Sequence, residues 1–171
     1  MAHRYAIIVA GGRGLRMGAD LPKQFLPLRG EPVLMRTLRQ FALEVEEVIL
    51  VLPAEQQDLW RELCAEHHFT LPHRITTGGA TRFDSVRSGL SKLPAEGLVA
   101  VHDGVRPLVS RTLIRRTFEI AKETGAALPA CPVTDSLRLL GEDDTNEAVD
   151  RARYRAVQTP QTFDLERLHR A

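Results

Sequence analysis

The chain has 171 residues, which fits one globular domain, and its contents of 43% apolar and 26% charged residues are ordinary for a soluble protein. Lys and Arg number 23 against 22 Asp and Glu, so the net charge of +1 argues against nucleic-acid binding through a broad cationic surface. No apolar run reaches the length of a membrane span. We therefore expect a cytoplasmic protein that binds neither nucleic acid nor membrane, with Cys64 and Cys131 as reduced, buried thiols.

Short apolar runs alternate with amphipathic stretches along most of the chain. Strands are predicted over 5–10, 47–52, 74–76, 98–102 and 126–131. Helices are predicted between them, the first opening at Pro32 and the last capped by Ser110. Strands that alternate with helices of about 10–15 residues indicate βαβ units and a parallel sheet covered on both faces. The sequence predicts an α/β fold with a doubly wound, mostly parallel sheet, in a single domain spanning 1–171.

The pattern changes after Thr134. Residues 136–140 predict a strand and 141–146 a polar turn, whereas 147–158 are polar, rich in Arg and without helical periodicity. We therefore predict that the segment of about 134–160 forms a protruding β-arm outside the core. Asp164 is expected to cap a short final helix.

The first predicted strand runs directly into a glycine-rich loop, Ala10–Gly18 (AGGRGLRMG). Parallel sheets place ligands at the carboxyl ends of their strands, and a glycine turn there lets backbone N–H groups approach a phosphate. The loop lacks the Gly-Lys-Ser/Thr of a P-loop, and Met17 replaces the third glycine of a dinucleotide fingerprint. Arg13, Arg16 and Lys23 place three cations near the turn, which suits a triphosphate. The alternative is a glycine turn with solvated arginines.

Four sequence blocks carry a family resemblance. They are Ala10–Met17 followed by Leu21–Phe25 (LPKQF), Gly78–Val86, Val101–Pro107 and Gln158–Phe163. In this order they resemble the 2-C-methyl-D-erythritol 4-phosphate cytidylyltransferase family of nucleotidyltransferases, which has a Rossmann-like fold. The resemblance runs from residue 6 to the end of the chain. It implies cytidylyl transfer from CTP to 2-C-methyl-D-erythritol 4-phosphate, giving 4-diphosphocytidyl-2-C-methyl-D-erythritol and pyrophosphate in non-mevalonate isoprenoid synthesis.

The resemblance also implies the site residues. Arg16 and Lys23 would act on the triphosphate as the catalytic cations. The nucleotide-binding set is Ala10, Gly11, Gly12, Gly14, Gly79, Arg82, Ser85 and Gly104. The substrate-binding set is Asp103, Arg106, Ser136, Arg151 and Thr159. From the residues alone, Asp103 and Arg106 could equally form an internal salt bridge in an Asp-Gly turn, and His102, at a strand end, is expected to be a buried core residue. Ala80 departs from the family pattern, which often has an acidic residue there, so no role is transferred to it.

The same resemblance implies a cofactor and a partner. Mg²⁺ would arrive with CTP, because no dedicated carboxylate cage and no protein metal site are evident in the sequence. A homodimer would form through the arm, so that Arg151 reaches the active site of the neighbouring subunit. Two other functions stay open, a ribitol-5-phosphate cytidylyltransferase and a non-catalytic nucleotide-binding domain. Family members continue beyond the Thr-Pro-Gln block for a few dozen residues, so we expect the C-terminal part of the family domain to be absent from this chain.

Overall fold

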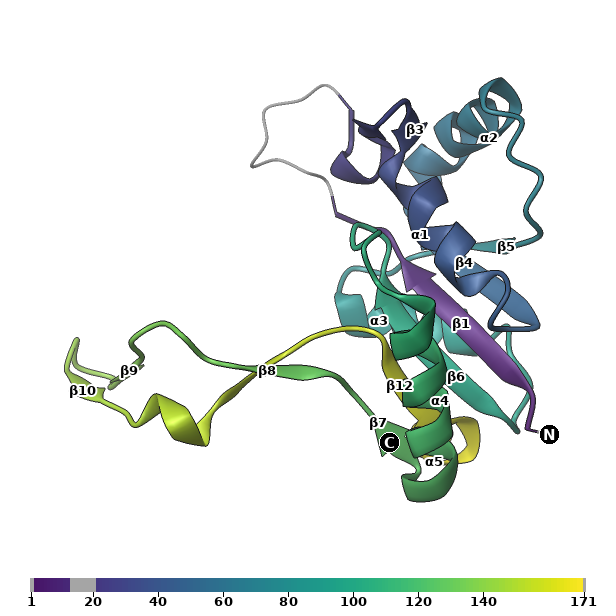
Figure 1. Cartoon of the computed structure of the whole chain (residues 1–171). Helices are drawn as coiled ribbons and strands as arrows, with labels where there is room; N and C mark the ends of the chain where they lie inside the picture. The colour runs from purple at the N-terminus through teal and green to yellow at the C-terminus, as the bar shows by residue number, and fades with distance from the viewer. Residues whose placement is uncertain (1, 13–20, 171) are drawn as a thin grey trace.

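The computed structural model describes residues 2–12 and 21–170. A six-stranded sheet forms its centre, in the order β5-β4-β1-β6-β12-β7 (Figure 1). These strands are β5 (Arg74–Thr77), β4 (Glu47–Leu52), β1 (Arg4–Val9), β6 (Leu98–Asp103), β12 (Gln161–Asp164) and β7 (Ala126–Ala127). The first four are parallel, whereas β12 runs antiparallel to both β6 and β7. The predicted mostly parallel α/β sheet is therefore confirmed.

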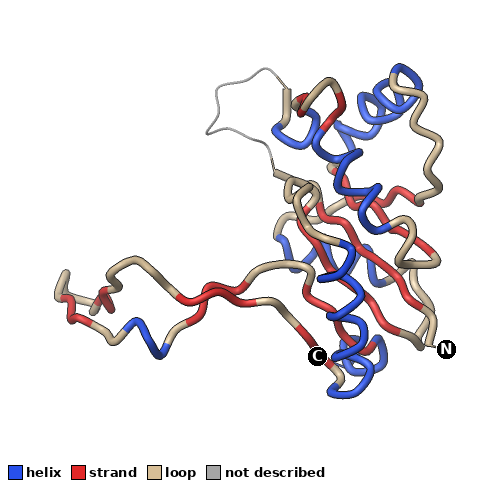
Figure 2. The backbone as a smooth tube through the Cα atoms, viewed as in Figure 1, coloured by secondary structure: helices blue, strands red, loops and turns tan. Residues whose placement is uncertain are grey.

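Helices cover both faces of this sheet, as the doubly wound prediction requires (Figure 2). One face carries α1 (Val33–Phe41), α2 (Gln57–Glu66) and α4 (Arg111–Thr124), and the other carries α3 (Arg82–Leu90) and α5 (Leu165–Arg170). Successive side chains of a strand point to opposite faces. Ala6 and Ile8 of β1 accordingly pack with the first group of helices, and Tyr5 and Ile7 with the second. A strand buried on both sides has to be apolar throughout, which explains the continuous run in the sequence.

The predicted helix caps are present. Ser110 Oγ accepts a hydrogen bond from the backbone N–H of Leu113 at 3.2 Å, at the start of α4. Asp164 Oδ1 accepts one from the backbone N–H of Arg167 at 3.0 Å, at the start of α5. Each bond satisfies a donor that the helix itself leaves unpaired. No helix in the described part of the chain is both long and apolar enough to cross a membrane.

Residues 128–160, here named the arm segment, leave the sheet between β7 and β12 (Figure 1). Two short antiparallel ladders form there, β8 (Ala130–Pro132) with β11 (Arg155–Val157) and β9 (Arg138–Leu140) with β10 (Asn146–Ala148). A short helix, η3 (Arg151–Arg153), precedes β11. All residues of these four strands are exposed, so the ladders bury no core of their own in one chain.

Three details differ from the sequence expectations. The single strand expected over 126–131 is wrong, because the chain leaves the sheet at Leu128–Pro129 and proline has no N–H for a ladder. Cys131, in β8, is exposed instead of buried, and Cys64 is only part-buried. The antiparallel strand β12 was not expected, since its four residues carry neither an apolar run nor a regular alternation.

His102 of β6 is fully buried, as expected of a core residue. Its ring lies 4.9 Å from the ring of Phe41, and its Nε2 lies 3.1 Å from the carbonyl oxygen of Arg106. A carbonyl only accepts hydrogen bonds, so Nε2 carries the hydrogen. Burial lowers the pKa of His102 to about 4. The ring is therefore neutral near pH 7 and fixes the turn that follows β6.

We predict that this burial makes stability depend on pH. Between about pH 6.5 and 4 the unfolded chain binds a proton at His102 that the folded protein excludes. The free energy of unfolding should therefore fall by about 3 kcal/mol as the pH is lowered through this window. His102→Gln keeps an N–H donor without titrating, so urea unfolding at pH 4–7 should show a weaker pH dependence by that amount. An equal dependence in both proteins would contradict the prediction.

Candidate active site

A cleft of about 860 Å³ opens at the carboxyl ends of the four parallel strands. Its walls are the segments that follow them: Ala10–Gly12 after β1, Pro53–Glu55 after β4, Gly78–Arg82 after β5, and Asp103, Val105 and Arg106 after β6. The short helix η1 (Lys23–Phe25) adds Lys23 and Gln24. Parallel strands end at one edge of a sheet, so loops distant in sequence converge there.

Lys23 lies across the start of the glycine-rich loop. A β-carbon placed on Gly12 would lie 3.1 Å from Lys23 Cε and 3.7 Å from Nζ. The bare backbone of Gly12 therefore gives the lysine side chain its space. A cation beside exposed backbone at the end of a strand suits a phosphate group. Gly14 and Arg16, predicted for the same loop, lie outside the described residues.

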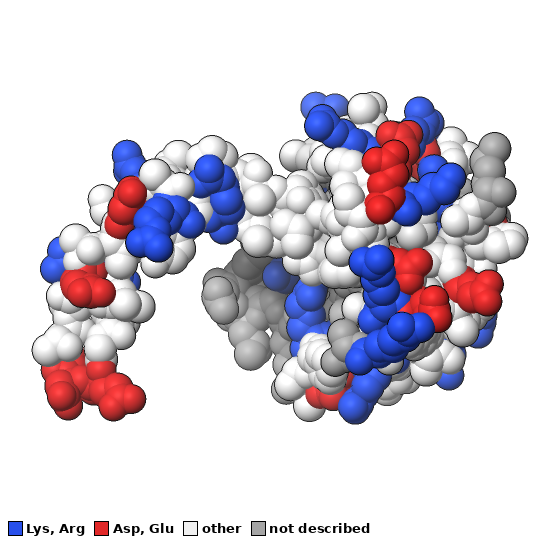
Figure 3. All heavy atoms as spheres, turned by 90° about the horizontal axis from the view of Figure 1, so that it is seen from below, with Lys and Arg blue, Asp and Glu red and all other residues white. Residues whose placement is uncertain are grey.

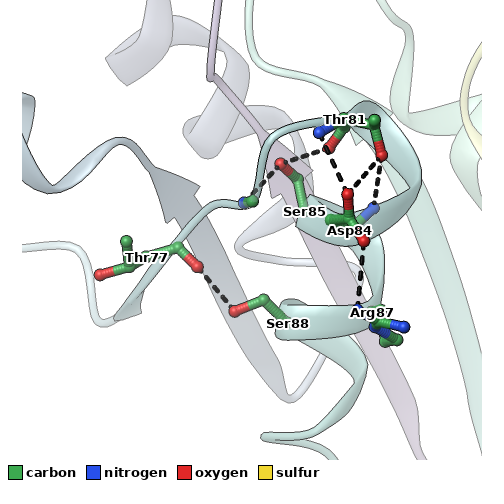
Figure 4. A network of polar contacts seen from close by, with 7 residues as sticks. Thr77, Thr81, Asp84, Ser85, Arg87 and Ser88 are labelled. Atoms are coloured by element: carbon green, nitrogen blue, oxygen red, sulfur yellow. Dashed lines mark hydrogen bonds and ion pairs between the residues drawn. The ribbon is translucent and has the colours of Figure 1, made fainter.

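The loop after β5 is tied to the first turn of α3 (Figure 4). Thr81 Oγ1 accepts from the backbone N–H of Asp84 at 3.1 Å, while the Asp84 carboxylate accepts from the backbone N–H of Thr81 at 3.3 Å. This is a capping box. Ser85 Oγ donates to the carbonyl of Thr81 at 3.0 Å and accepts from the N–H of Gly79 at 3.2 Å. The hydrogen bonds from Thr81 lower the pKa of Asp84, so its carboxylate is ionised. Together these hydrogen bonds hold the loop after β5 in place without a ligand.

Asp103, the last residue of β6, is held by two arginines. Arg106 Nε donates to Asp103 Oδ2 at 2.8 Å, and Arg82 Nη2 lies 3.4 Å from Oδ1. Arg106 also donates through Nη1 to Gln158 Oε1 at 2.6 Å, which joins the cleft to the root of the arm segment. The internal salt bridge considered for Asp103 and Arg106 is thus present. Both arginine side chains stay about half exposed, at 49% and 47%, so N–H groups remain for an anionic ligand.

Four predicted site residues lie away from the described cleft. Gly104 lies beneath it, where a β-carbon would be 2.9 Å from both Ala10 Cβ and Leu34 Cδ1. Thr159 is 9% exposed, and its Oγ1 has no hydrogen-bond partner among the described residues. Ser136 and Arg151 are exposed in the arm segment. One chain therefore gathers most of the nucleotide set but not the substrate residues of the arm.

The lining of the cleft includes Gln24 and Glu55, to which no role was assigned from the sequence. Gln24 is fully buried and Glu55 is exposed, and both line the cleft. The sequence held no usable signal for Gln24, because its burial and the hydrogen-bond partners that a buried polar side chain needs become evident only in the fold. Within residues 2–12 and 21–170, no group of three or more His, Cys, Asp or Glu side chains is arranged to hold a metal ion.

Comparison with known proteins decides the family. Residues 5–171 match the model of the 2-C-methyl-D-erythritol 4-phosphate cytidylyltransferase family. The chain belongs to this family. A relative of that name from Porphyromonas gingivalis is 56% identical over 168 residues, which covers 98% of this chain and 75% of the relative. Another from Bacteroides thetaiotaomicron is 54% identical over 167 residues, covering 96% and 76%. The protein is thus a nucleotidyltransferase of isoprenoid synthesis.

Solved structures agree with this assignment. The crystal structure of 4-diphosphocytidyl-2C-methyl-D-erythritol synthase from Anaerococcus prevotii superposes with a TM-score of 0.81 at 29% identity, covering 99% of this chain and 74% of that one. The 2-C-methyl-D-erythritol 4-phosphate cytidylyltransferase from Thermus thermophilus gives a TM-score of 0.73 at 36% identity, covering 99% and 73%. The chain spans about three quarters of the length of these proteins.

We predict that Gly79→Ala weakens nucleotide binding. A β-carbon at Gly79 would lie 2.2 Å from Asp84 Cβ and 3.2 Å from the Asp84 backbone carbon, so the loop after β5 has to move. Steric overpacking of this kind displaces the loop, and we expect the affinity for CTP to fall by about tenfold. Calorimetric titration with CTP measures this change. Gly141→Ala, in the arm segment, is the control and should bind CTP normally. Normal affinity in Gly79→Ala would remove this loop from the nucleotide site.

Proposed function

We propose that the described cleft transfers a cytidylyl group from CTP to 2-C-methyl-D-erythritol 4-phosphate, releasing pyrophosphate. The observation that carries the proposal is the convergence of four segments in a chain of this family. These are the start of the glycine loop, Lys23, the Gly79–Ser85 turn and the Asp103–Arg106 corner. The first two suit a triphosphate, and the last two suit a nucleoside and a second phosphate.

The reaction needs no general base. A phosphate monoester has a second pKa of about 6 and is mostly a dianion at pH 7, so its oxygen is already a nucleophile. That oxygen attacks the α-phosphorus of CTP in line, a new P–O bond forms, and the bond to the bridging oxygen breaks as pyrophosphate leaves. The described lining of the cleft holds three cations, two carboxylates and no His, and the carboxylate of Asp103 is already paired with two arginines. Catalysis then consists of positioning and of neutralising negative charge in the transition state.

The proposed roles of the described residues rest on their place in the cleft, and that of Arg16 rests on the family resemblance. Lys23, together with Arg16, stabilises charge on the triphosphate, and Ala10–Gly12 approach it with their backbone. Gly79 and Ser85 hold the cytidine. The Asp103–Arg106 corner binds the second substrate, the carboxylate accepting from its hydroxyls and the guanidinium pairing its phosphate.

Magnesium bound with the nucleotide would supply further charge neutralisation. The carboxylate of Asp103 already pairs with two arginines, so it is not free to hold a metal ion by itself. The cleft therefore fits a metal ion that is bound mainly by the nucleotide. Mg²⁺ typically keeps several waters and binds through substrate phosphates with only one or two protein carboxylates. Glu55 is the other carboxylate of the described lining.

We predict that Lys23→Ala lowers kcat by about 10²-fold or more, with a smaller change in KM for CTP, because one preorganised charge contact in the transition state is lost. Arg16→Ala should behave in the same way. Lys122, exposed on α4, offers a matched control, since Lys122→Ala removes the same charge away from the cleft. Near-normal turnover in Lys23→Ala would remove this lysine from the mechanism.

We also propose that the arm segment completes the cleft of a second subunit. Arg151 and Ser136 lie in the arm segment and do not line the described cleft of their own chain. Leu139, Leu140 and Val157 are 54%, 77% and 49% exposed, so these apolar side chains are available to pack against a second copy. Figure 3 shows acidic side chains gathered at the far end of the arm segment and basic ones nearer the sheet, a charge separation that suits docking on a second copy.

A mixing experiment tests the shared site. Arg151→Ala and Lys23→Ala proteins, each of low activity alone, should recover part of the activity after subunits exchange, because mixed dimers contain one cleft with both residues intact. Arg151→Ala and Asp103→Ala should each raise KM for the alcohol phosphate more than KM for CTP. No recovery from verified mixed dimers would rule out a shared site.

Pyrophosphate release from CTP is the assay for the reaction as a whole. Release is expected with 2-C-methyl-D-erythritol 4-phosphate and only weakly with ribitol 5-phosphate. The reverse preference would favour the ribitol enzyme, and CTP binding without any release would favour a non-catalytic domain. We also propose a cytoplasmic location, which the unpaired cysteines Cys64 and Cys131 support.

A further inference from the structure

Gln24 is a fully buried polar side chain beside the cleft. Its amide nitrogen donates to the carbonyl oxygen of Ala10 at 2.9 Å and to Gln56 Oε1 at 2.6 Å. Ala10 is the residue at which β1 passes into the glycine loop. Gln56 ends the short helix η2 (Ala54–Gln56), which follows β4. One amide group thus joins three segments that form the walls of the cleft.

The atoms around this amide are fixed from several sides. The backbone N–H of Ala10 donates to the carbonyl of Val51 at 3.0 Å, so both backbone polar groups of Ala10 are engaged. Phe25, next to Gln24, is buried with its ring 6.1 Å from that of Trp60. Between these anchors, the bond from Gln24 to Ala10 sets the separation of η1 from the glycine loop. Lys23, the preceding residue of η1, crosses the bare backbone of Gly12 at that separation.

The chemistry of Gln24 also argues against a purely structural role. Its Oε1 is buried and has no hydrogen-bond partner among the described residues. A buried acceptor left unpaired lowers stability, and an apolar side chain of similar shape would avoid that loss. A glutamine gives this position two directed N–H donors, and one of them ends on Ala10, at the start of the loop that is proposed to bind the phosphates.

We infer that Gln24 is a positioning residue that holds Lys23 against the glycine loop for phosphate neutralisation. The inference rests on the proposed function, because the role of Lys23 is defined there. Gln24 itself need not touch a substrate. Small displacements of a catalytic group are costly, since a misplacement of about 1 Å can lower a rate by about 10²-fold.

A double-mutant cycle tests whether Gln24 acts through Lys23. Gln24→Met, of similar length and without donors, should lower kcat by about tenfold or more, with a smaller change in KM for CTP. In a Lys23→Ala background the same change should have less than about a twofold effect, because the group being positioned is gone. Thr162→Val is the matched control: it removes another buried hydrogen bond, to Thr117 Oγ1 at 2.9 Å, and should lower Tm while leaving kcat unchanged.

Gln24→Glu gives a second signature. A carboxylate has no donor for the two acceptors, so the kcat of this variant relative to the original protein should be low at pH 8. Protonation restores one donor, and the ratio of the two kcat values should rise as the pH is lowered towards 6. A ratio that does not change with pH would mean that the donated hydrogen bond is irrelevant to turnover.

An NMR measurement that does not require catalytic turnover separates this inference from the proposed function. The chain has only three lysines, Lys23, Lys92 and Lys122, so reductive methylation with ¹³C labels few sites for NMR. Gln24→Met should shift the Lys23 signal, assigned with Lys23→Ala, and leave the other two unchanged. An unmoved Lys23 signal, or equal kcat losses with and without Lys23, would overturn the inference. Lack of any turnover in the original protein, with a shifted signal in Gln24→Met, would instead overturn only the proposed function.

Discussion

The parallel register of β1 with its two neighbours is the constraint on which the cleft depends. Val9, the last residue of β1, stands opposite Val51 of β4 and Asp103 of β6. The glycine loop and the Asp103–Arg106 corner therefore leave the sheet at the same level and face each other. A slip of one residue would turn every side chain of a strand to the opposite face, which the buried apolar side chains on both faces prevent. The packing of the core thus fixes the position along the strands at which the charged groups of the cleft lie next to each other.

The same constraint explains which parts of the fold could be predicted from the sequence. Strands buried on both faces have apolar runs, so β1, β4 and β6 were evident, and their parallel orientation, though not their order in the sheet, followed from the helices between them. Strand β12 had no such local signal. Thr162 is fully buried there only because its hydroxyl donates to Thr117 Oγ1 of α4, a partner 45 residues away. The strand expected over 126–131 failed for a related reason, since the point at which a chain leaves a sheet depends on its neighbours.

For the site, the sequence indicated which residues matter more clearly than what each one does. Gly79 and Gly104 both come shortly after a strand, and the family resemblance placed both in the nucleotide-binding set. In the structure, the absent β-carbon of Gly79 makes room for Asp84, and that of Gly104 makes room for Ala10 and Leu34. Residue spacing cannot distinguish a glycine that packs from one that faces a ligand. Gln24 was overlooked for the same reason, because its importance lies in a hydrogen bond across the chain to Ala10.

The charge of the described cleft indicates how much positive charge the proposed reaction still requires. The described lining contains three cations and two carboxylates, namely Lys23, Arg82, Arg106, Glu55 and Asp103, so its formal charge is only +1. The triphosphate and the phosphate monoester together bring roughly −6, taking about −2 for each terminal phosphate and −1 for each bridging one. Charges of one sign held this close in a partly desolvated cleft repel strongly unless they are neutralised. Arg16 in the glycine loop, Mg²⁺ on the nucleotide and Arg151 from a second subunit are proposed to supply the missing positive charge. On this account Asp103 does not oppose binding, because by holding Arg82 and Arg106 in fixed directions it lets two like charges share one corner before any anion arrives.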